Sequence, residues 1–522
     1  MNEARKMNNK LIRLIALLLV STMLLFAVVA CDSGSGGGDE SSNVGGDSGG
    51  PSGGDNSNPS GGGNDETTFE NHSIPEGLEY GNSISILYWQ DVPEPEFEVK
   101  DVSLDHTLQS IYERNQKTVQ LLGLNPEDGL VWTPLNGGNE TRAAEFATHV
   151  GASWTSGNRD YDIVAGYSRA TALCAINGYL ADLAAIDDSY IDLSRIWWTP
   201  SLVETVEIDD SIYFLSGDIS TNTIHMMYTM FCNTEMIKEL NLQDPVAMAV
   251  NGTWTVDAFM GLCEGVFLEQ NQDSKPSAGD RFAFVSKEEF TAAFYNGSDL
   301  FAIDTDEDEV LVISDDFTST KATLLVNKLV DFYQTIDVRG RGTPQTEFIA
   351  ENALFTQYTM RFAQSYLSKV TFKYAALPTP KYDERQVGYR TAVSPSMTLY
   401  GIMRDVENDP DMLTECTAVL EALAYHGYRY TTPQIFETNL KVKYTDASDL
   451  NTVKCFDLIR EGVVYDLGNI FPKSETGTYI FERFAATIVG KDDWANVKAA
   501  NLAMLKNHLE DVVEKFDKVK YN

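Results

Sequence analysis

The stretch Ile84-Ser85-Ile86-Leu87-Tyr88-Trp89 predicts the first strand of the folded part of the chain, which begins near Ser83. It is short and consists mainly of β-branched, aromatic and other apolar residues. A helical pattern follows, with apolar residues at helical spacing between Asp105, which suits an N-cap, and Gly123, which suits a helix end. The first unit of the fold is therefore a strand followed by a helix.

The same rhythm continues along the chain. Residues 130–132 and 161–167 are predicted strands, and residues 142–150 and 170–183 are predicted helices that follow them. Strands that alternate with helices are typical of a parallel sheet with right-handed crossovers. About 450 folded residues exceed one ordinary hydrophobic core. We therefore expect an α/β fold with two lobes.

Later elements are predicted from the same patterns. An acidic run at 304–308 invites a calcium reading, but an EF loop needs Gly at its sixth position and Glu at its twelfth, where this chain has Glu309 and Asp315. We interpret the run as the solvated tip of a hairpin. The other predictions are a hairpin with a polar turn at 209–215, a strand at 225–232, a helix opened by Thr253 as N-cap, a hairpin at 301–314, a helix at 317–334, a strand at 372–380, a helix from Met412 closed by Gly427, and a last helix from about Asp493.

The first 66 residues have a different composition. An apolar run at 14–30, interrupted only by Ser21 and Thr22, follows four basic residues, which indicates a signal peptide at 1–30. Its end, Val28-Val29-Ala30-Cys31, resembles the lipobox of bacterial lipoproteins. The resemblance implies that Cys31 is lipidated and anchors the protein at the outer face of the cytoplasmic membrane. A transmembrane anchor is the alternative, but the run is at the lower limit for a span. Residues 31–66 are rich in Gly, Ser and Asp and predict a disordered stalk.

Composition excludes several classes of function. A formal net charge of −38 argues against nucleic acid as a partner, because phosphate binding needs a basic surface. Apart from Cys31 the cysteines are far apart with no CxxC motif, so a disulfide framework is not expected, and the histidines form no metal-ligand spacing. No nucleophile elbow or P-loop is present, and we expect no cofactor and no enzyme activity. Because the chain has so many carboxylates, the sequence does not exclude a pair of them placed for glycoside hydrolysis.

The order of motifs resembles the extracellular solute-binding proteins of ATP-binding-cassette importers, in the carbohydrate-type family that includes maltose-binding protein. Two departures fall on framework positions, with Cys232 where Tyr is usual and Asn251-Gly252 where Pro is usual. The stretches that carry the resemblance are DYDIV at 160–164, YLADL at 179–183, YTMFCNTEM at 228–236, NGTWTVDAF at 251–259 and ALPTP at 376–380.

The resemblance implies a periplasmic-binding-protein-like fold with a ligand cleft and a hinge between its lobes. Lobe 1 would comprise residues 80–225 and 376–427, and lobe 2 residues 226–375 and 428–522. The chain would cross the hinge near 221–230, 372–380 and 428–434. The resemblance implies a monomer that delivers a small ligand, a sugar or oligosaccharide, to a permease.

Candidate ligand contacts follow from the chemistry of sugars, which stack on aromatic faces and form hydrogen bonds with Asp, Asn, Gln and Arg side chains at their polar rims. Such contacts should lie at the carboxyl ends of parallel strands. Trp132 and Trp254 are set aside as core residues. Trp197 and Trp198 are adjacent, so at most one of them should face inward on a strand while the other caps an edge. The candidates are Tyr88, Trp89, Gln90 and Asp91 after the first strand, Tyr167 and Arg169 after the third, Asp218, Tyr228 at a hinge crossing, and Tyr389 beside Arg390.

Two other functions remain alternatives at the level of sequence. A surface hydrolase that degrades glycans would need a pair of catalytic carboxylates in a cleft. A sensory or adhesive lipoprotein with the same fold would serve a signalling partner in place of a permease.

Overall fold

The computed structural model describes residues 71–273, 275–307, 310–436, 450–471 and 479–521. All of them belong to one compact unit of the chain. The predicted signal peptide, Cys31 and the stalk lie outside the described residues. Within them no helix is both long enough and apolar enough to cross a membrane.

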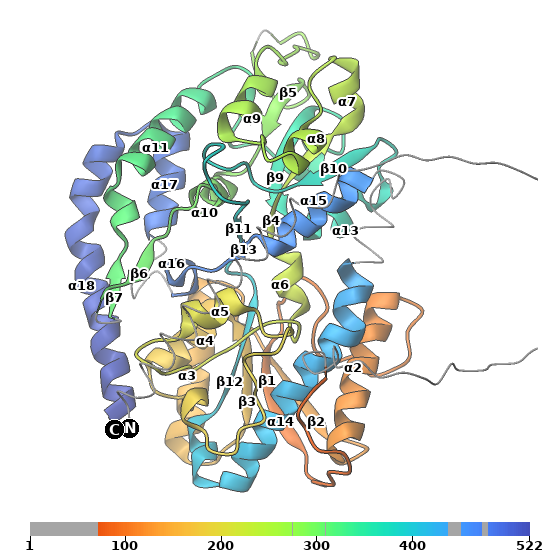
Figure 1. The fold of residues 1–522 in the computed structure, drawn as a ribbon, viewed down its shortest axis with the longest axis vertical. Coiled ribbons are helices and arrows are strands. Elements are labelled where there is room, and N and C mark those ends of the chain that lie inside the picture. The colour runs from red at the N-terminus through yellow and green to blue at the C-terminus, as the bar shows by residue number, and fades with distance from the viewer. Residues whose placement is uncertain (1–70, 274, 308–309, 437–449, 472–478, 522) are drawn as a thin grey trace, which may run out of the picture. The chain divides into compact units, whose positions relative to one another are not determined.

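One four-stranded sheet forms the core of the first lobe, in the order β12-β3-β1-β2 (Figure 1). β1 runs parallel to β2 and β3, whereas β12 is antiparallel at the edge. In β1 the side chains of Ile84, Ile86, Leu87 and Trp89 are all buried, as expected for a strand covered on both faces. The predicted first strand and parallel sheet are confirmed. The strands are β1 (Ile84–Trp89), β2 (Leu130–Leu135), β3 (Ile163–Tyr167) and β12 (Thr398–Ile402).

The helices α4 and α14 pack on this sheet, α3 packs on α4, and α2 packs on α14. The helix α2 begins and ends as the sequence predicts. The Asp105 carboxylate accepts hydrogen bonds from the Thr107 and Leu108 amides, and Gly123 takes the left-handed conformation at φ 56°. The helices are α2 (His106–Leu122), α3 (Glu140–Ser156), α4 (Ser168–Ile176), α5 (Pro200–Val206), α6 (Thr221–His225) and α14 (Pro410–His426), with a π-helical turn at Gly427–Thr431.

A five-stranded sheet forms the core of the second lobe, in the order β10-β4-β9-β5-β8. It is mixed, because β4 is antiparallel to both of its neighbours while β5 is parallel to β9 and β8. The predicted acidic hairpin is confirmed as β6 and β7. The strands are β4 (Tyr228–Asn233), β5 (Phe282–Val285), β8 (Val338–Arg339), β9 (Ala353–Thr359), β10 (Tyr374–Leu377), β6 (Ile303–Thr305) and β7 (Leu311–Ile313).

Helices of the second lobe are mostly short, and the last helix of the chain, α18, is the longest of the described part. The five described cysteines are buried, and no disulfide joins any of them. The helices are α7 (Thr234–Glu239), α8 (Pro245–Val250), α9 (Val256–Cys263), α10 (Ala293–Gly297), α11 (Thr320–Tyr333), α12 (Pro344–Glu347), α13 (Arg361–Ser365), α15 (Leu450–Glu461), α16 (Leu467–Ile470), α17 (Tyr479–Gly490) and α18 (Trp494–Tyr521), with a 3-10 turn η2 (Glu288–Ala292) and short strands β11 (Thr391–Ala392) and β13 (Val463–Val464).

The chain passes between the sheets from α6 to β4, from β10 to β12, and after α14 toward α15, which packs on α8 and β10. These passages fall near the predicted crossings, and the residue boundaries of the lobes stay a prediction. The first passage is fixed by a buried carboxylate. Glu96 accepts hydrogen bonds from the Tyr400 hydroxyl (2.6 Å), the Ser220 hydroxyl (2.9 Å) and the Asn222 side chain (2.8 Å). Arg114 donates to the Glu96 carbonyl at 2.6 Å.

Several predicted boundaries are wrong. The helix predicted to reach residue 183 ends at Ile176, because the chain then turns through Gly178 (φ 75°). His225 lies in helix α6 and not in the strand that follows. Thr255, not Thr253, caps α9. Gly427 does not close α14, since its backbone stays helical and the helix continues as a π turn.

Two further predictions are corrected. The predicted hairpin at 209–215 is reduced to a tight turn, in which Ile208 bridges Ser211. At most one of Trp197 and Trp198 was expected to face inward, yet both are fully buried. They do not lie on a strand, and their indole N–H groups donate to the two carboxylate oxygens of Glu421 on α14, at 3.1 and 2.8 Å.

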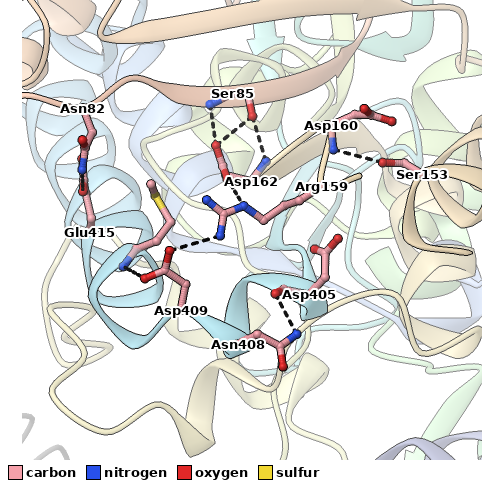
Figure 2. Close-up of polar contacts among 11 residues, drawn as sticks. Asn82, Ser85, Ser153, Arg159, Asp160, Asp162, Asp405, Asn408, Asp409 and Glu415 are labelled. Atoms are coloured by element: carbon pink, nitrogen blue, oxygen red, sulfur yellow. Dashed lines mark hydrogen bonds and ion pairs between the residues drawn. The ribbon is translucent and has the colours of Figure 1, made fainter. Parts of the chain in front are cut away.

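A polar network holds the amino-terminal edge of the first sheet (Figure 2). Asp162, in the DYDIV stretch, accepts hydrogen bonds from the backbone amide and the hydroxyl of Ser85 at 2.9 and 2.7 Å. Arg159 lies between Asp162 (3.5 Å) and Asp409 at the start of α14 (3.3 Å). The network therefore joins β1, β3 and α14, whereas Asp160 of the same stretch has an exposed side chain.

We expect Asp162→Ala to lower the free energy of unfolding by about 1–3 kcal/mol, because it leaves the Ser85 amide without its acceptor and removes one of the two carboxylates beside Arg159. Asp160→Ala is the matched control and should change it by less than about 0.5 kcal/mol. Urea unfolding of both variants measures the difference. Equal losses would show that burial of Asp162 has no energetic role.

The Glu421 carboxyl should make stability depend on pH. Burial raises the pKa of Glu421 to about 7 from an ordinary 4.5, although the tryptophan hydrogen bonds oppose the shift. The stabilisation from its protonated form is complete below pH 4.5 and is lost as the pH rises through about 7. We expect Glu421→Gln to flatten the decline in unfolding free energy across this range, measured by urea unfolding at several pH values. The exposed Glu145→Gln variant should keep the wild-type slope, and an unchanged slope in Glu421→Gln would contradict the assignment.

Candidate functional site

The carboxyl end of β3 meets the start of β4 and the η2 turn at the junction of the two lobes. Five side chains gather there, and we call them the central cluster: Tyr167, Arg169, Tyr228, Phe290 and Tyr358. All five are buried, with exposed fractions of 4%, 9%, 7%, 9% and 6% in that order. The ring of Phe290 lies 6.1 Å from that of Tyr228 and 4.6 Å from that of Tyr358.

Polar groups surround the hydroxyl of Tyr228. It is hydrogen-bonded to Ser394, and Glu289, Arg169 and Tyr167 lie close enough to act on it electrostatically. Burial raises the pKa of Tyr228 to about 12, although the Ser394 hydrogen bond lowers it. The hydroxyl therefore stays protonated and can donate. Arg169 reaches across to the Asn469 carbonyl of α16 at 3.3 Å.

A cavity of about 440 Å³ opens beside Glu289, where η2 packs on α17. Its polar side chains are Glu288, Glu289, Glu482 and Arg483, and two alanines complete the wall. All of these residues belong to the second lobe. Aromatic faces in the central cluster and carboxylate and guanidinium groups in the cavity are the chemistry that a polyhydroxylated ligand requires.

A second and larger cavity, of about 740 Å³, lies between α5 of the first lobe and the β6–β7 hairpin of the second. We call it the lateral cavity. Arg390, Arg460 and Tyr465 line it together with β13, and Ser201 of α5 donates to the Val463 carbonyl at 2.9 Å. Its arginines already face carboxylates, since Arg390 lies 2.8 Å from Asp299. The central cluster offers the better aromatic surface.

The four candidates after β1 occupy different environments. Tyr88 is half-buried against Phe97, with ring centroids 4.5 Å apart, and burial raises its pKa. Trp89 is 1% exposed, donates to the Thr398 hydroxyl at 2.9 Å, and lies 5.6 Å from the ring of Tyr167. Trp89 thus supports Tyr167 from within the core. Gln90 is exposed.

Asp91 organises the loop after β2. Its carboxylate accepts hydrogen bonds from the amides of Gly137 (2.8 Å) and Gly138 (2.9 Å) and from Arg142 (2.7 Å). Burial alone would raise the pKa of Asp91, but these hydrogen bonds outweigh it and lower the pKa. A Cβ on Gly138 would lie 2.8 Å from the Asp91 carboxyl carbon, so the loop needs glycine there.

The last two candidates lie away from the central cluster. Asp218 accepts a hydrogen bond from the Thr432 hydroxyl at 2.6 Å and lies 3.7 Å from Arg460, at the edge of the lateral cavity. Tyr389 is buried and donates to the Ala249 carbonyl of α8 at 2.9 Å. The structure therefore brings Tyr167, Arg169 and Tyr228 together and leaves Asp218 and Tyr389 elsewhere. Ligand contact by any candidate stays a prediction.

Sequence reasoning missed Glu289, Phe290 and Tyr358. The strand Phe282–Val285 was not predicted, although its apolar run is a strand pattern, and residues 287–290 follow its carboxyl end. The rule that picked Tyr88 and Tyr167 would have picked this segment as well. Across the described residues no group of three or more His, Cys, Asp or Glu side chains is arranged to hold a metal ion.

Comparison with solved structures identifies the architecture. The galacto-N-biose/lacto-N-biose I-binding protein of the ABC transporter from Bifidobacterium longum, in complex with lacto-N-biose, matches with a TM-score of 0.53 at 12% identity, over 82% of this chain and 98% of that one. The cyclic α-maltosyl-1,6-maltose-binding protein from Arthrobacter globiformis matches with a TM-score of 0.51 at 12% identity, over 84% and 99%. A sugar transporter protein from Rhizobium etli in an open conformation gives 0.50 at 11%, over 83% and 99%.

The chain has the two-lobed solute-binding-protein fold. No family model and no curated protein sequence matches it. At such low identity the likeness is one of fold, and it agrees with the fold predicted from the sequence. In the solute-binding-protein fold the central cluster occupies the junction of the lobes, where both sheets contribute side chains.

We expect Asp91→Ala to loosen the loop beside β1, because a hydrogen bond to a charged group contributes about 1.5–3 kcal/mol. Hydrogen exchange of the Gly137 and Gly138 amides should become about tenfold faster or more. Gln90→Ala, an exposed neighbour, should leave it unchanged. Protection that survives in Asp91→Ala would mean that other contacts hold the loop.

Proposed function

We propose that the protein is an extracellular solute-binding receptor, which captures a sugar or oligosaccharide between its lobes and delivers it to an ATP-binding-cassette importer. The observation that carries the proposal is the central cluster, which combines aromatic faces with Arg169 and the Tyr228 hydroxyl at the junction of the lobes. Proteins with the same fold are named for sugars that they bind. Glu289 and the carboxylates beside it supply acceptors for sugar hydroxyls.

Ligand binding would act by population shift. The ligand contacts both lobes only when they close around it, so it binds the closed arrangement better and increases its population. No covalent chemistry is required. We also propose that lipid chains on Cys31 anchor the receptor to the membrane and keep it beside its permease. A monomer is sufficient for this function, because one chain supplies both lobes.

A thermal-unfolding screen against mono- and oligosaccharides, amino acids and short peptides tests the proposal. A ligand at a hundredfold excess over its Kd stabilises the native state by about 2.7 kcal/mol, which is a clear rise in Tm. We expect a sugar to raise the Tm and to be recovered unchanged. Cleavage of the sugar would indicate the hydrolase alternative, and a rise with peptides alone would overturn the carbohydrate assignment.

Once a sugar is found, Glu289→Ala should weaken its binding about tenfold or more, because hydrogen bonds to a charged group are lost. Asp331→Ala, an exposed carboxylate on α11, is the matched control and should bind as the wild type does. Isothermal titration calorimetry measures both. Equal affinity in the two variants would place the ligand away from the cavity beside Glu289.

A further inference from the structure

Helix α18 contacts both lobes along one flank of the molecule (Figure 1). It has 28 residues and is therefore about 42 Å long. It packs on α11, α17 and β7 of the second lobe and on α4 of the first. None of the three chain passages between the sheets includes it, so it joins the lobes in addition to the hinge.

The amino-terminal half of α18 is fixed to the second lobe. Trp494 is 1% exposed, and its ring lies 5.3 Å from Phe317 and 6.2 Å from Phe484. Lys498 donates to the Thr323 hydroxyl at 2.9 Å. These contacts are mainly apolar and buried, so this half moves with the second lobe.

The carboxyl-terminal half reaches the first lobe through a few side chains. Phe516 is buried and stacks on Tyr213, with centroids 5.4 Å apart and ring planes 24° apart. Lys520 donates to the carbonyl of Asp209 and forms an ion pair with its carboxylate at 2.5 Å. A Cβ on Gly178 would lie 3.1 Å from Val519, so glycine permits the helix to approach this closely.

Unfilled space lies beside these contacts. A cavity of about 180 Å³ lies beside Phe516, between Tyr213 and the hairpin residues Val310 and Leu311. The larger lateral cavity lies between the same hairpin and α5. The lobes therefore have room to shift against each other on this flank, and the carboxyl-terminal turns of α18 are the contact that such a shift must change.

The opposite flank is pinned close to the hinge. Glu94 of the first lobe accepts hydrogen bonds from Arg361 (3.1 Å) and Ser365 (2.6 Å) on α13. Its carbonyl accepts from Asn222 of α6, at the first passage between the lobes. Figure 1 shows α13 and α18 on opposite flanks. A rotation about the pinned flank displaces the α18 flank most.

We propose that α18 is a strap that holds the lobes in the arrangement seen here and opposes closure around a ligand. The cavity beside Glu289 is lined by the second lobe alone, so the first lobe does not close over it in this arrangement. Closure requires Phe516 and Lys520 to leave Tyr213 and Asp209. Contacts made only in the open arrangement lower the population of the closed arrangement, which is the one that binds the ligand. The apparent affinity for the ligand falls in the same proportion.

Two variants test the strap. Lys520→Ala removes the ion pair with little risk to folding, and Phe516→Ala removes the stacked ring. Lys518→Ala is the matched control, because its partner Glu514 lies on the same helix at 3.6 Å. Spin labels at Glu145→Cys on α3 and Leu324→Cys on α11, both exposed, report the distance between the lobes. Cys31→Ser in the full chain leaves the introduced thiols as the accessible ones, since the five other cysteines are buried.

Without ligand, we expect Lys520→Ala and Phe516→Ala to change the distance distribution, and Lys518→Ala to leave it as in the wild type. With a sugar from the thermal screen, whose existence rests on the proposed function, the change should run toward the ligand-bound distribution. The sugar should bind about three- to tenfold more tightly.

A distance distribution in Lys520→Ala and Phe516→Ala identical to the wild type would overturn the strap, as would weaker or equal sugar binding. If no sugar binds any variant while the ligand-free distribution still changes, the proposed function fails and the strap stands.

Discussion

The buried carboxylate of Glu96 is the interaction on which the arrangement of the lobes depends. It is 1% exposed and accepts hydrogen bonds from the Tyr400 hydroxyl of β12 and from four donors of residues 220–222 at the first passage between the lobes. Arg114 on α2, itself fully buried, ties the same segment through the Glu96 and Ile219 carbonyls. Burial lowers the pKa of Arg114 and raises that of Tyr400. A charge placed so deeply is tolerated only with every partner present, which fixes the start of the hinge in one geometry.

With the passage fixed, the site follows from where the two sheets end. β3 delivers Tyr167 and Arg169, β4 begins with Tyr228, and η2 brings Phe290 from the other lobe. The rings and polar groups are buried and ordered before any ligand arrives. Binding therefore costs little conformational entropy of these side chains. The remaining cost of binding is the movement of the lobes. In the proposed receptor, the affinity would be set through the equilibrium between open and closed arrangements as much as through direct contacts.

The two flanks then have different roles. Near the hinge, Glu94 joins Arg361 through a largely buried ion pair, whose separation would leave a desolvated charge. On the other flank, α18 meets the first lobe through one stacked ring and one exposed ion pair, beside unfilled space. The exposed ion pair is easily exchanged for water, and the ring of Phe516 already has unfilled space beside it. This difference in cost indicates which flank moves, and it makes the last helix part of the conformational equilibrium.

The sequence by itself determined the local structure and the class of fold. The apolar strands, the capped helix α2, the acidic hairpin and the two-lobed α/β architecture follow from periodicity, capping residues and motif order, because these depend on near neighbours in the chain. Only the tertiary structure decided which side chains meet. Trp197 and Trp198 both turn inward because Glu421, more than 200 residues later, offers both of its oxygens. Gly427 is a glycine because a Cβ there would lie 2.0 Å from the Asp218 carbonyl oxygen, not because a helix ends. Asp218 and Tyr389 have the right chemistry for a sugar site, yet distant partners hold them elsewhere, since spacing along the chain carries no information about contacts between lobes.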